Sequence, residues 1–233
     1  MSKPGLPRDP KSSPQALRRF VDQARQLQPR PGAGRLMFAL DATASRQPTW
    51  DRACHLQARM FQATQHLSAL SIQLCFYRGL DEFKALPWLE DGGLIRRKML
   101  GVTCLGGHTQ LGRVLRHALS EHRRAPLRGL VFVGDALEEA PGPLSELAGE
   151  MGLRRLPAFL FQEGRDEAAA SAFATIARLS GGAHCQFDQH SEQQLLELLT
   201  TVAVYASGGA APAQRLTLHS PAARRLLQQL PES

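Results

Sequence analysis

Five oxygen-bearing side chains that stand beside apolar runs or glycines decide what chemistry this chain can do. They are Asp41, Thr43, Ser45, Thr109 and Asp135. The first three alternate along a segment that directly follows the apolar run 36–40, and the last one follows the apolar run 130–134. Carboxylate and hydroxyl oxygens are hard donors of the kind that Mg²⁺ and Mn²⁺ prefer. Asp41, Thr43 and Ser45 together therefore suit a divalent metal ion.

The elements around these residues predict how they are positioned. The apolar run that ends at Asp41 is typical of a strand buried on both faces, and ligands bind at the carboxyl ends of such strands. The link between segments 71–79 and 81–86 is too short for a crossover, so we expect these two strands to be antiparallel. Strands are predicted over 36–41, 71–79, 81–86, 130–134, 156–164 and 183–188. Helical spacing of apolar residues predicts helices over 14–27, 50–69, 94–100, 143–151, 166–179, 192–206 and 221–230, and a further one just after Thr109.

The alternation of strands and helices predicts a doubly wound α/β sheet. The order of the motifs is strand–Asp-x-Thr-x-Ser–helix, then Gly-Gly-x-Thr–helix, then strand–Asp, and it resembles the von Willebrand factor A (VWA) domain over residues 35–206. Within that family the chain is most similar to bacterial, cytoplasmic members. The resemblance implies a three-layer, Rossmann-like fold with a mostly parallel six-stranded sheet and one antiparallel edge strand. It also implies a metal-ion-dependent adhesion site (MIDAS) at three loops.

The same resemblance implies a role for each site residue. Thr43 and Ser45 would bind Mg²⁺ or Mn²⁺ through their hydroxyls, Asp41 and Asp135 would act mainly through waters, and Thr109 would bind directly or through a water. A protein partner would supply an Asp or Glu to the remaining position of the metal. A site of this kind holds no nucleophile and no general base, so we expect no catalysis.

Two departures from the family pattern surround these residues. Thr43 stands where the family usually has Ser, and Ala136 stands after Asp135 where the family frequently has Gly. Glu138 and Glu139 lie close by in sequence and would add negative charge, which reduces the attraction for an acidic partner.

The remaining sequence predicts the domain organisation and the compartment. We expect an N-terminal tail with a short helix over 1–34, the VWA domain over 35–206, and a linker with a short C-terminal helix over 207–233. That last helix either docks on the domain or binds a partner. The four cysteines lie far apart and do not suggest a disulfide framework. Without a signal-peptide pattern or a membrane-spanning run, the expectation is a cytoplasmic protein that needs no membrane.

Two other functions fit parts of the sequence. Asp41 with Thr43, and Asp135 with Glu138, imitate a haloacid-dehalogenase-type Mg²⁺-dependent phosphohydrolase, which uses an Asp nucleophile. However, Thr43 stands where those enzymes carry an acid–base Asp, and the candidate lysines precede Thr109. The net charge of +7 comes mostly from arginine and allows nucleic-acid binding. The chain has few aromatic residues for base stacking, so nucleic acid is not the partner that we expect.

Overall fold

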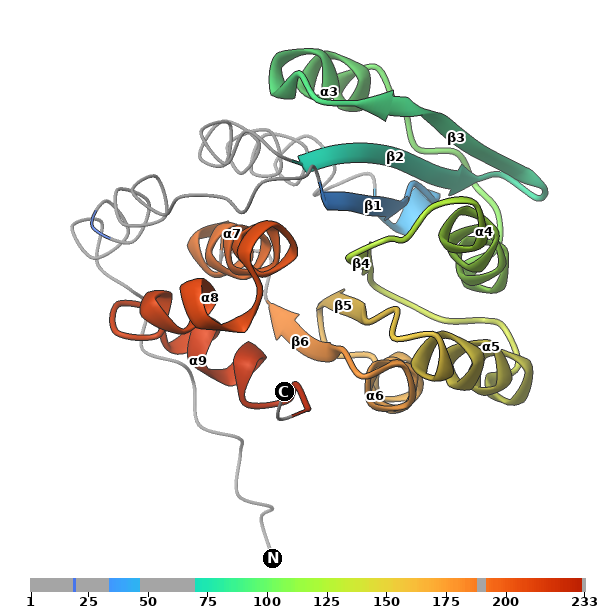
Figure 1. Cartoon of the computed structure of the whole chain (residues 1–233). Helices are drawn as coiled ribbons and strands as arrows, with labels where there is room; N and C mark the ends of the chain where they lie inside the picture. The colour runs from blue at the N-terminus through green and yellow to red at the C-terminus, as the bar shows by residue number, and fades with distance from the viewer. Residues whose placement is uncertain (1–18, 20–33, 47–69, 188–191, 232–233) are drawn as a thin grey trace, which may run out of the picture.

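The computed structural model describes residue 19 and residues 34–46, 70–187 and 192–231. These residues build one six-stranded sheet in the order β3-β2-β1-β4-β5-β6 (Figure 1). All neighbouring strands are parallel except β2 and β3, which are antiparallel. The predicted fold class, including its antiparallel edge strand, is therefore confirmed. The strands are β1 (Gly34–Asp41), β2 (Leu70–Arg78), β3 (Glu82–Leu89), β4 (Gly129–Gly134), β5 (Ala158–Glu163) and β6 (Ala183–Phe187).

Helices cover both faces of this sheet, which makes three layers (Figure 1). Nothing among the helices of the described residues is both long and apolar enough to cross a membrane. The helices predicted over 14–27 and 50–69 lie outside the described residues. The helical elements are η1 (Ala44–Arg46), α3 (Gly92–Leu100), α4 (Leu111–Arg124), α5 (Pro141–Leu153), α6 (Glu167–Ser180), α7 (Glu192–Gly208), α8 (Ala210–Leu216) and α9 (Pro221–Leu227).

The central strand β1 separates two hydrophobic cores because its side chains alternate between the two faces of the sheet. Leu36, Phe38 and Leu40 are buried in the core that α7 covers, together with part of α9. Met37 and Ala39 are buried in the core that α4, α5 and α6 cover. A strand apolar on both faces is possible only in the middle of a sheet. This is why the apolar run before Asp41 becomes the centre of the fold.

The C-terminal segment is part of the packed domain. The segment from residue 207 was predicted to begin with a linker, whose residues 208–214 contain glycines and a proline, but α7 continues to Gly208 and α8 begins at Ala210. Helix α9 then packs against α7 and against the edge strand β6. Beyond it, the Gln229 side-chain amide accepts a hydrogen bond from the His184 N–H and donates one to the His184 carbonyl, both at 3.0 Å. One side chain thus occupies a donor and an acceptor on the open edge of β6.

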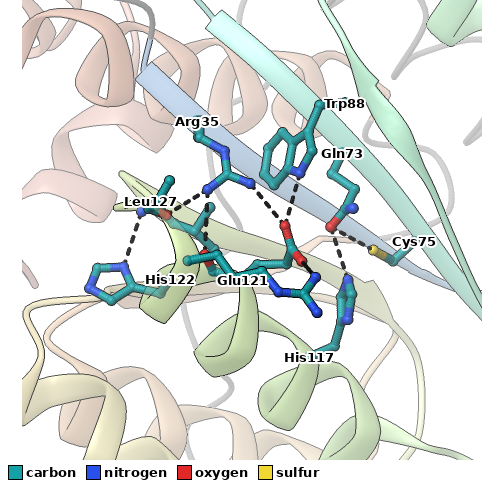
Figure 2. A network of polar contacts seen from close by, with 10 residues as sticks. Arg35, Gln73, Cys75, Trp88, His117, Glu121, His122 and Leu127 are labelled. Atoms are coloured by element: carbon teal, nitrogen blue, oxygen red, sulfur yellow. Dashed lines mark hydrogen bonds and ion pairs between the residues drawn. The ribbon is translucent and has the colours of Figure 1, made fainter.

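A polar network at the start of β1, at the other end of the strand from Asp41, connects α4 to the sheet (Figure 2). The Glu121 carboxylate of α4 accepts hydrogen bonds from Arg35 at 2.8 Å, Trp88 at 2.9 Å and Arg124 at 2.6 Å. The Arg35 guanidinium also stacks 3.9 Å above the centre of the Trp88 ring. Burial raises the pKa of Glu121, but these three hydrogen bonds outweigh it and leave that pKa below its usual value. The network fixes the helix that begins beside Thr109.

Candidate metal centre

Asp41 is the last residue of β1, and its carboxylate is held on both oxygens. The side chain is fully buried. Its Oδ1 accepts a hydrogen bond from the Thr43 N–H at 2.8 Å, and its Oδ2 accepts one from the Tyr77 hydroxyl at 2.9 Å. Burial raises the pKa of Asp41, and repulsion from Asp135 adds to that rise. The carboxylate is therefore rigidly oriented, and a nearby cation would favour its charged form.

The turn after Asp41 places two hydroxyls together. Thr43 Oγ1 and Ser45 Oγ are 3.1 Å apart, with Thr43 buried and Ser45 exposed. The next residue, Arg46, turns inward and forms a buried ion pair with Glu163 at the end of β5. This pair anchors the turn across the sheet. The two hydroxyls consequently lie side by side where the protein interior meets solvent.

The loop before α4 is inserted where β1 and β2 diverge. The Leu105 N–H donates to the Ala42 carbonyl at 3.0 Å, and the Leu105 carbonyl accepts from the Gly79 N–H at 3.3 Å. A Cβ atom on Gly107 would lie 1.8 Å from the Gly79 carbonyl oxygen, so this position requires glycine. The close approach explains one glycine of the Gly-Gly-x-Thr motif and brings Thr109 toward the turn that carries Thr43.

Thr109 is hydrogen-bonded to the loop that follows β4 through both its hydroxyl and its backbone N–H. Its Oγ1 accepts a hydrogen bond from the Glu138 N–H at 2.9 Å, while its own N–H donates to the Glu138 carboxylate at 3.1 Å. The Glu139 carboxylate accepts from Gly112 N–H at 2.9 Å and from Leu111 N–H, and so caps the start of α4. Burial raises the pKa of Glu139, although the cap and a hydrogen bond from Thr109 act against that rise. The second and third loops of the predicted site thus form one unit.

Asp135 follows β4 and completes the group. A Cβ atom added to its neighbour Gly134 would lie 3.5 Å from the Cβ of Asp41, so the ends of β1 and β4 are adjacent. Burial raises the pKa of the Tyr77 hydroxyl, and the negative charges of Asp41, Glu139 and Asp135 raise it further. Asp135 Oδ1 is buried and has no hydrogen-bond partner among the described residues. The structure therefore brings the five predicted site residues to the same edge of the sheet.

Comparison of the chain with protein-family models and with curated protein sequences finds no match. Solved structures do match. A von Willebrand factor type A protein from Catenulispora acidiphila superposes with a TM-score of 0.61 at 16% identity, over 76% of this chain and 43% of that protein. The VWA domain of SpRpn10 superposes with a TM-score of 0.57 at 12% identity, over 77% of this chain and 98% of that domain. The chain has the VWA fold.

A third VWA-like match shows how widely the fold is used. The human COPII-coat protein Sec24c superposes with a TM-score of 0.56 at 13% identity, over 80% of this chain and 33% of that protein. This chain spans less than half of the Catenulispora and human proteins and nearly the whole SpRpn10 domain. At such identities the similarity establishes the VWA fold, whereas the chemistry of the site must be argued from this chain's own residues.

The donors present fit a small, hard cation. Asp135 Oδ1 is an uncompensated buried oxygen, and Thr43 and Ser45 present two adjacent hydroxyl oxygens. Among the described residues, no three His, Cys, Asp or Glu side chains gather into a metal-binding group. An ion at this edge would therefore depend on hydroxyl and water ligands, as Mg²⁺ tolerates better than Zn²⁺ does.

Two contributors to this edge were not predicted from the sequence. Tyr77 lies on β2 opposite Asp41 in the strand register. The one feature of the sequence that could have indicated its role is a polar hydroxyl near the end of an apolar strand. Glu139 was expected only to add charge, whereas the structure uses it as the cap of α4. The neighbouring His108 Nδ1 lies 3.0 Å from the Glu138 carboxylate, and the ring is 70% exposed. His108 therefore supports the loop and leaves much of its ring open to solvent.

Proposed function

We propose that this chain is a non-catalytic protein-binding module with the VWA fold that takes up Mg²⁺ or Mn²⁺ at Asp41, Thr43, Ser45, Thr109 and Asp135. The ion would engage an Asp or Glu of a partner protein, and the module would serve to assemble or regulate that partner. The observation that carries the proposal is the buried Asp135 Oδ1, which lacks a hydrogen-bond partner among the described residues. A buried, unsatisfied carboxylate oxygen is costly, and a bound cation with its waters would remove that cost.

Each residue of the site has a distinct part in this proposal. Thr43 and Ser45 would offer hydroxyl ligands, and their 3.1 Å separation allows both to face one ion. Asp41 is oriented by Tyr77, and Thr109 is oriented by the backbone N–H of Glu138. When bound, the ion supplies a positive charge that attracts an external carboxylate. Two carboxylates among the proposed ligands leave the ion able to accept that further acid.

The surroundings of Asp41 support a binding role over the phosphohydrolase alternative. A carboxylate nucleophile must be reached by the phosphorus of its substrate, but the Asp41 side chain is fully buried, and Thr43 N–H and the Tyr77 hydroxyl hold its two oxygens. We therefore expect no turnover of phosphoesters in the presence of Mg²⁺. Robust hydrolysis that Asp41→Asn abolishes would overturn the binding-module proposal in favour of the enzyme.

The proposed place of action is the cytoplasm. Cys75 and Cys185 are free thiols, which fits a reducing compartment. Fractionation of the native cell with an antibody against the chain tests this part. Recovery of the protein mainly in a secreted or membrane fraction would contradict it.

Titration calorimetry tests the metal site directly. Mg²⁺ and Mn²⁺ are titrated into the full chain and into the double variant Asp41→Ala/Ser45→Ala. The matched control is Asp81→Ala/Ser171→Ala, which removes an exposed carboxylate and an exposed hydroxyl outside the proposed ligand set. We expect binding by wild type and control, and loss of binding by the site variant. Equal affinity of the site variant and wild type would reject the metal site.

The partner claim needs a separate experiment. The tagged chain is used to capture proteins from the native cell in Mg²⁺ and in EDTA, with the Asp41→Ala/Ser45→Ala variant in parallel. A partner of the proposed kind is captured by wild type in Mg²⁺ alone and loses binding when one of its own Asp or Glu residues is replaced. Capture that is the same in EDTA and for the variant would contradict the metal-dependent mechanism.

A further inference from the structure

Arginines from three places in the chain lie at the amino-terminal ends of the parallel strands, opposite the candidate metal centre. Arg123 and Arg124 end α4, Arg128 precedes β4, and Arg154 and Arg155 follow α5. Helices α4 and α5 pack side by side (Figure 1). Because β4 has six residues, this edge lies roughly 20 Å from Asp135 at the other end of the strand. We call these five exposed residues the arginine edge.

Direct contacts hold the arginine edge together. The Glu150 carboxylate lies 3.5 Å from Arg123 and 2.9 Å from Arg154, so it joins the ends of α4 and α5. The Leu130 N–H donates to the Pro157 carbonyl at 2.9 Å. That register brings the backbone before β4 alongside the residues before β5, while the Arg128 side chain runs past Gly34 at the start of β1. The five residues therefore lie at the same end of the parallel strands, and Glu150 links two of them directly.

The arginine edge has a surplus of positive charge. Its ion pairs are with Glu150 and with Glu121, and Glu121 is buried and also pairs with Arg35. Arg128 and Arg155 form no ion pair with any other described residue. Like charges that are gathered on one surface raise the local potential and attract anionic groups. Guanidinium groups in particular bind carboxylates through paired hydrogen bonds.

An exposed leucine, Leu153, ends α5 and directly precedes Arg154 and Arg155. Leu153 is 91% exposed, the largest exposure among the large apolar side chains of the described residues. It lies on a rigid tip, because Arg155 adopts a left-handed conformation (φ 57°) and the Leu156 N–H closes the helix end on the Met151 carbonyl at 2.9 Å. A preformed tip of this kind loses little conformational entropy when a partner covers it.

We propose that the arginine edge, together with the adjoining Leu153, binds an acidic surface of a partner protein that offers an apolar residue to Leu153. Arginine is enriched in protein–protein interfaces, and an exposed leucine gains free energy when a partner removes it from water. A phosphate backbone would use the arginines but would gain nothing from a leucine. This surface is independent of the metal centre and lies at the other end of the strands. One chain would therefore bind two proteins at once.

The test compares three anionic probes of equal net charge by fluorescence anisotropy at near-physiological salt. They are a polyglutamate peptide, a glutamate peptide with interspersed leucines, and a short DNA duplex. The full chain is compared with Arg128→Glu/Arg154→Glu, with Leu153→Ser, and with the control Arg178→Glu/Arg215→Glu. The control reverses two exposed arginines elsewhere on the surface and so matches the change in net charge.

We expect the leucine-containing peptide to bind best, and its affinity to fall about tenfold or more in Arg128→Glu/Arg154→Glu but not in the control. Leu153→Ser should weaken that peptide and leave polyglutamate unchanged. Tighter binding of the duplex than of the leucine-containing peptide, unaffected by Leu153→Ser, would overturn the proposal in favour of nucleic acid. Equal loss of binding in the control would show an unspecific charge effect and would overturn it as well.

Discussion

Replacing Asp135 by alanine should stabilise the metal-free protein, although the removal of a partly buried side chain normally destabilises a protein. Asp135 Oδ1 is buried and has no hydrogen-bond partner among the described residues, and its charge repels Asp41. A buried acceptor without a partner costs about 1–3 kcal/mol. We therefore expect Asp135→Ala to raise the free energy of unfolding in EDTA by about 1 kcal/mol or more, which corresponds to roughly 2–4 °C in Tm per kcal/mol for a chain of this size.

Magnesium should reverse that order. A ligand that binds only the folded state stabilises it by about 2.7 kcal/mol when its concentration is a hundredfold above Kd. Wild type gains this free energy through Asp135, whereas the alanine variant should gain almost none. In EDTA the variant is then the more stable protein, and in saturating Mg²⁺ wild type is.

The pH dependence gives the same test a second readout. Burial, with repulsion from Asp135, raises the pKa of Asp41 above its ordinary value of 3.8 in the folded protein. A carboxyl whose pKa is raised by folding favours the folded state while it is protonated, and that contribution is lost as pH rises through the raised value. Metal-free wild type should therefore lose part of its stability from about pH 4 upward. In Asp135→Ala this loss should be smaller.

Thermal unfolding followed by circular dichroism, in EDTA and in Mg²⁺ over a pH series, measures all three effects. Asp81→Ala serves as the control, because Asp81 belongs to the same edge of the sheet but its side chain is 88% exposed. We expect this control to behave like wild type in both conditions. The reasoning is refuted if Mg²⁺ raises the Tm of Asp135→Ala as much as that of wild type, or if the variant is the less stable protein in EDTA.

Three further substitutions test other contacts. Tyr77→Phe removes the hydroxyl that donates to the buried Asp41 Oδ2, so it should lower the free energy of unfolding by about 1–2 kcal/mol. It should also weaken Mg²⁺ binding in calorimetry. Unchanged values for both would contradict the role of the hydroxyl. Glu121→Gln should cost about 2 kcal/mol in urea unfolding at pH 7. Because the folded pKa of Glu121 is lowered, the deficit should shrink as pH falls below the ordinary value of 4.5 and through the lowered one. Gln229→Ala frees the His184 N–H and carbonyl on β6, so light scattering should detect faster aggregation, and an unchanged rate would show that the edge is protected by other means.

Local patterns in the sequence were sufficient for most of the architecture. The apolar run that ends at Asp41 predicts a central strand because only the middle of a sheet buries both faces of a strand. The short link before β3 predicts antiparallel pairing because a crossover needs more residues. Thr109 and Asp135 came from the resemblance to the VWA domain, whereas Asp41, Thr43 and Ser45 follow from the same local logic, since they stand at the end of a strand. These features depend on near neighbours in the chain, which is why a single sequence determines them.

Other features depend on residues that are distant in sequence and were decided by the tertiary structure. The segment 208–214 contains glycines and a proline and was predicted as a linker, yet most of it is helical because α8 and α9 bury Ala213, Leu216 and Leu226 against the domain. Glu139 caps a helix that begins 28 residues earlier in the chain, and nothing in the local sequence indicates that hydrogen bond. The arginine edge likewise exists only because parallel strands bring their beginnings together. Spacing along the chain determines which residues end a strand, but packing determines which of those ends meet.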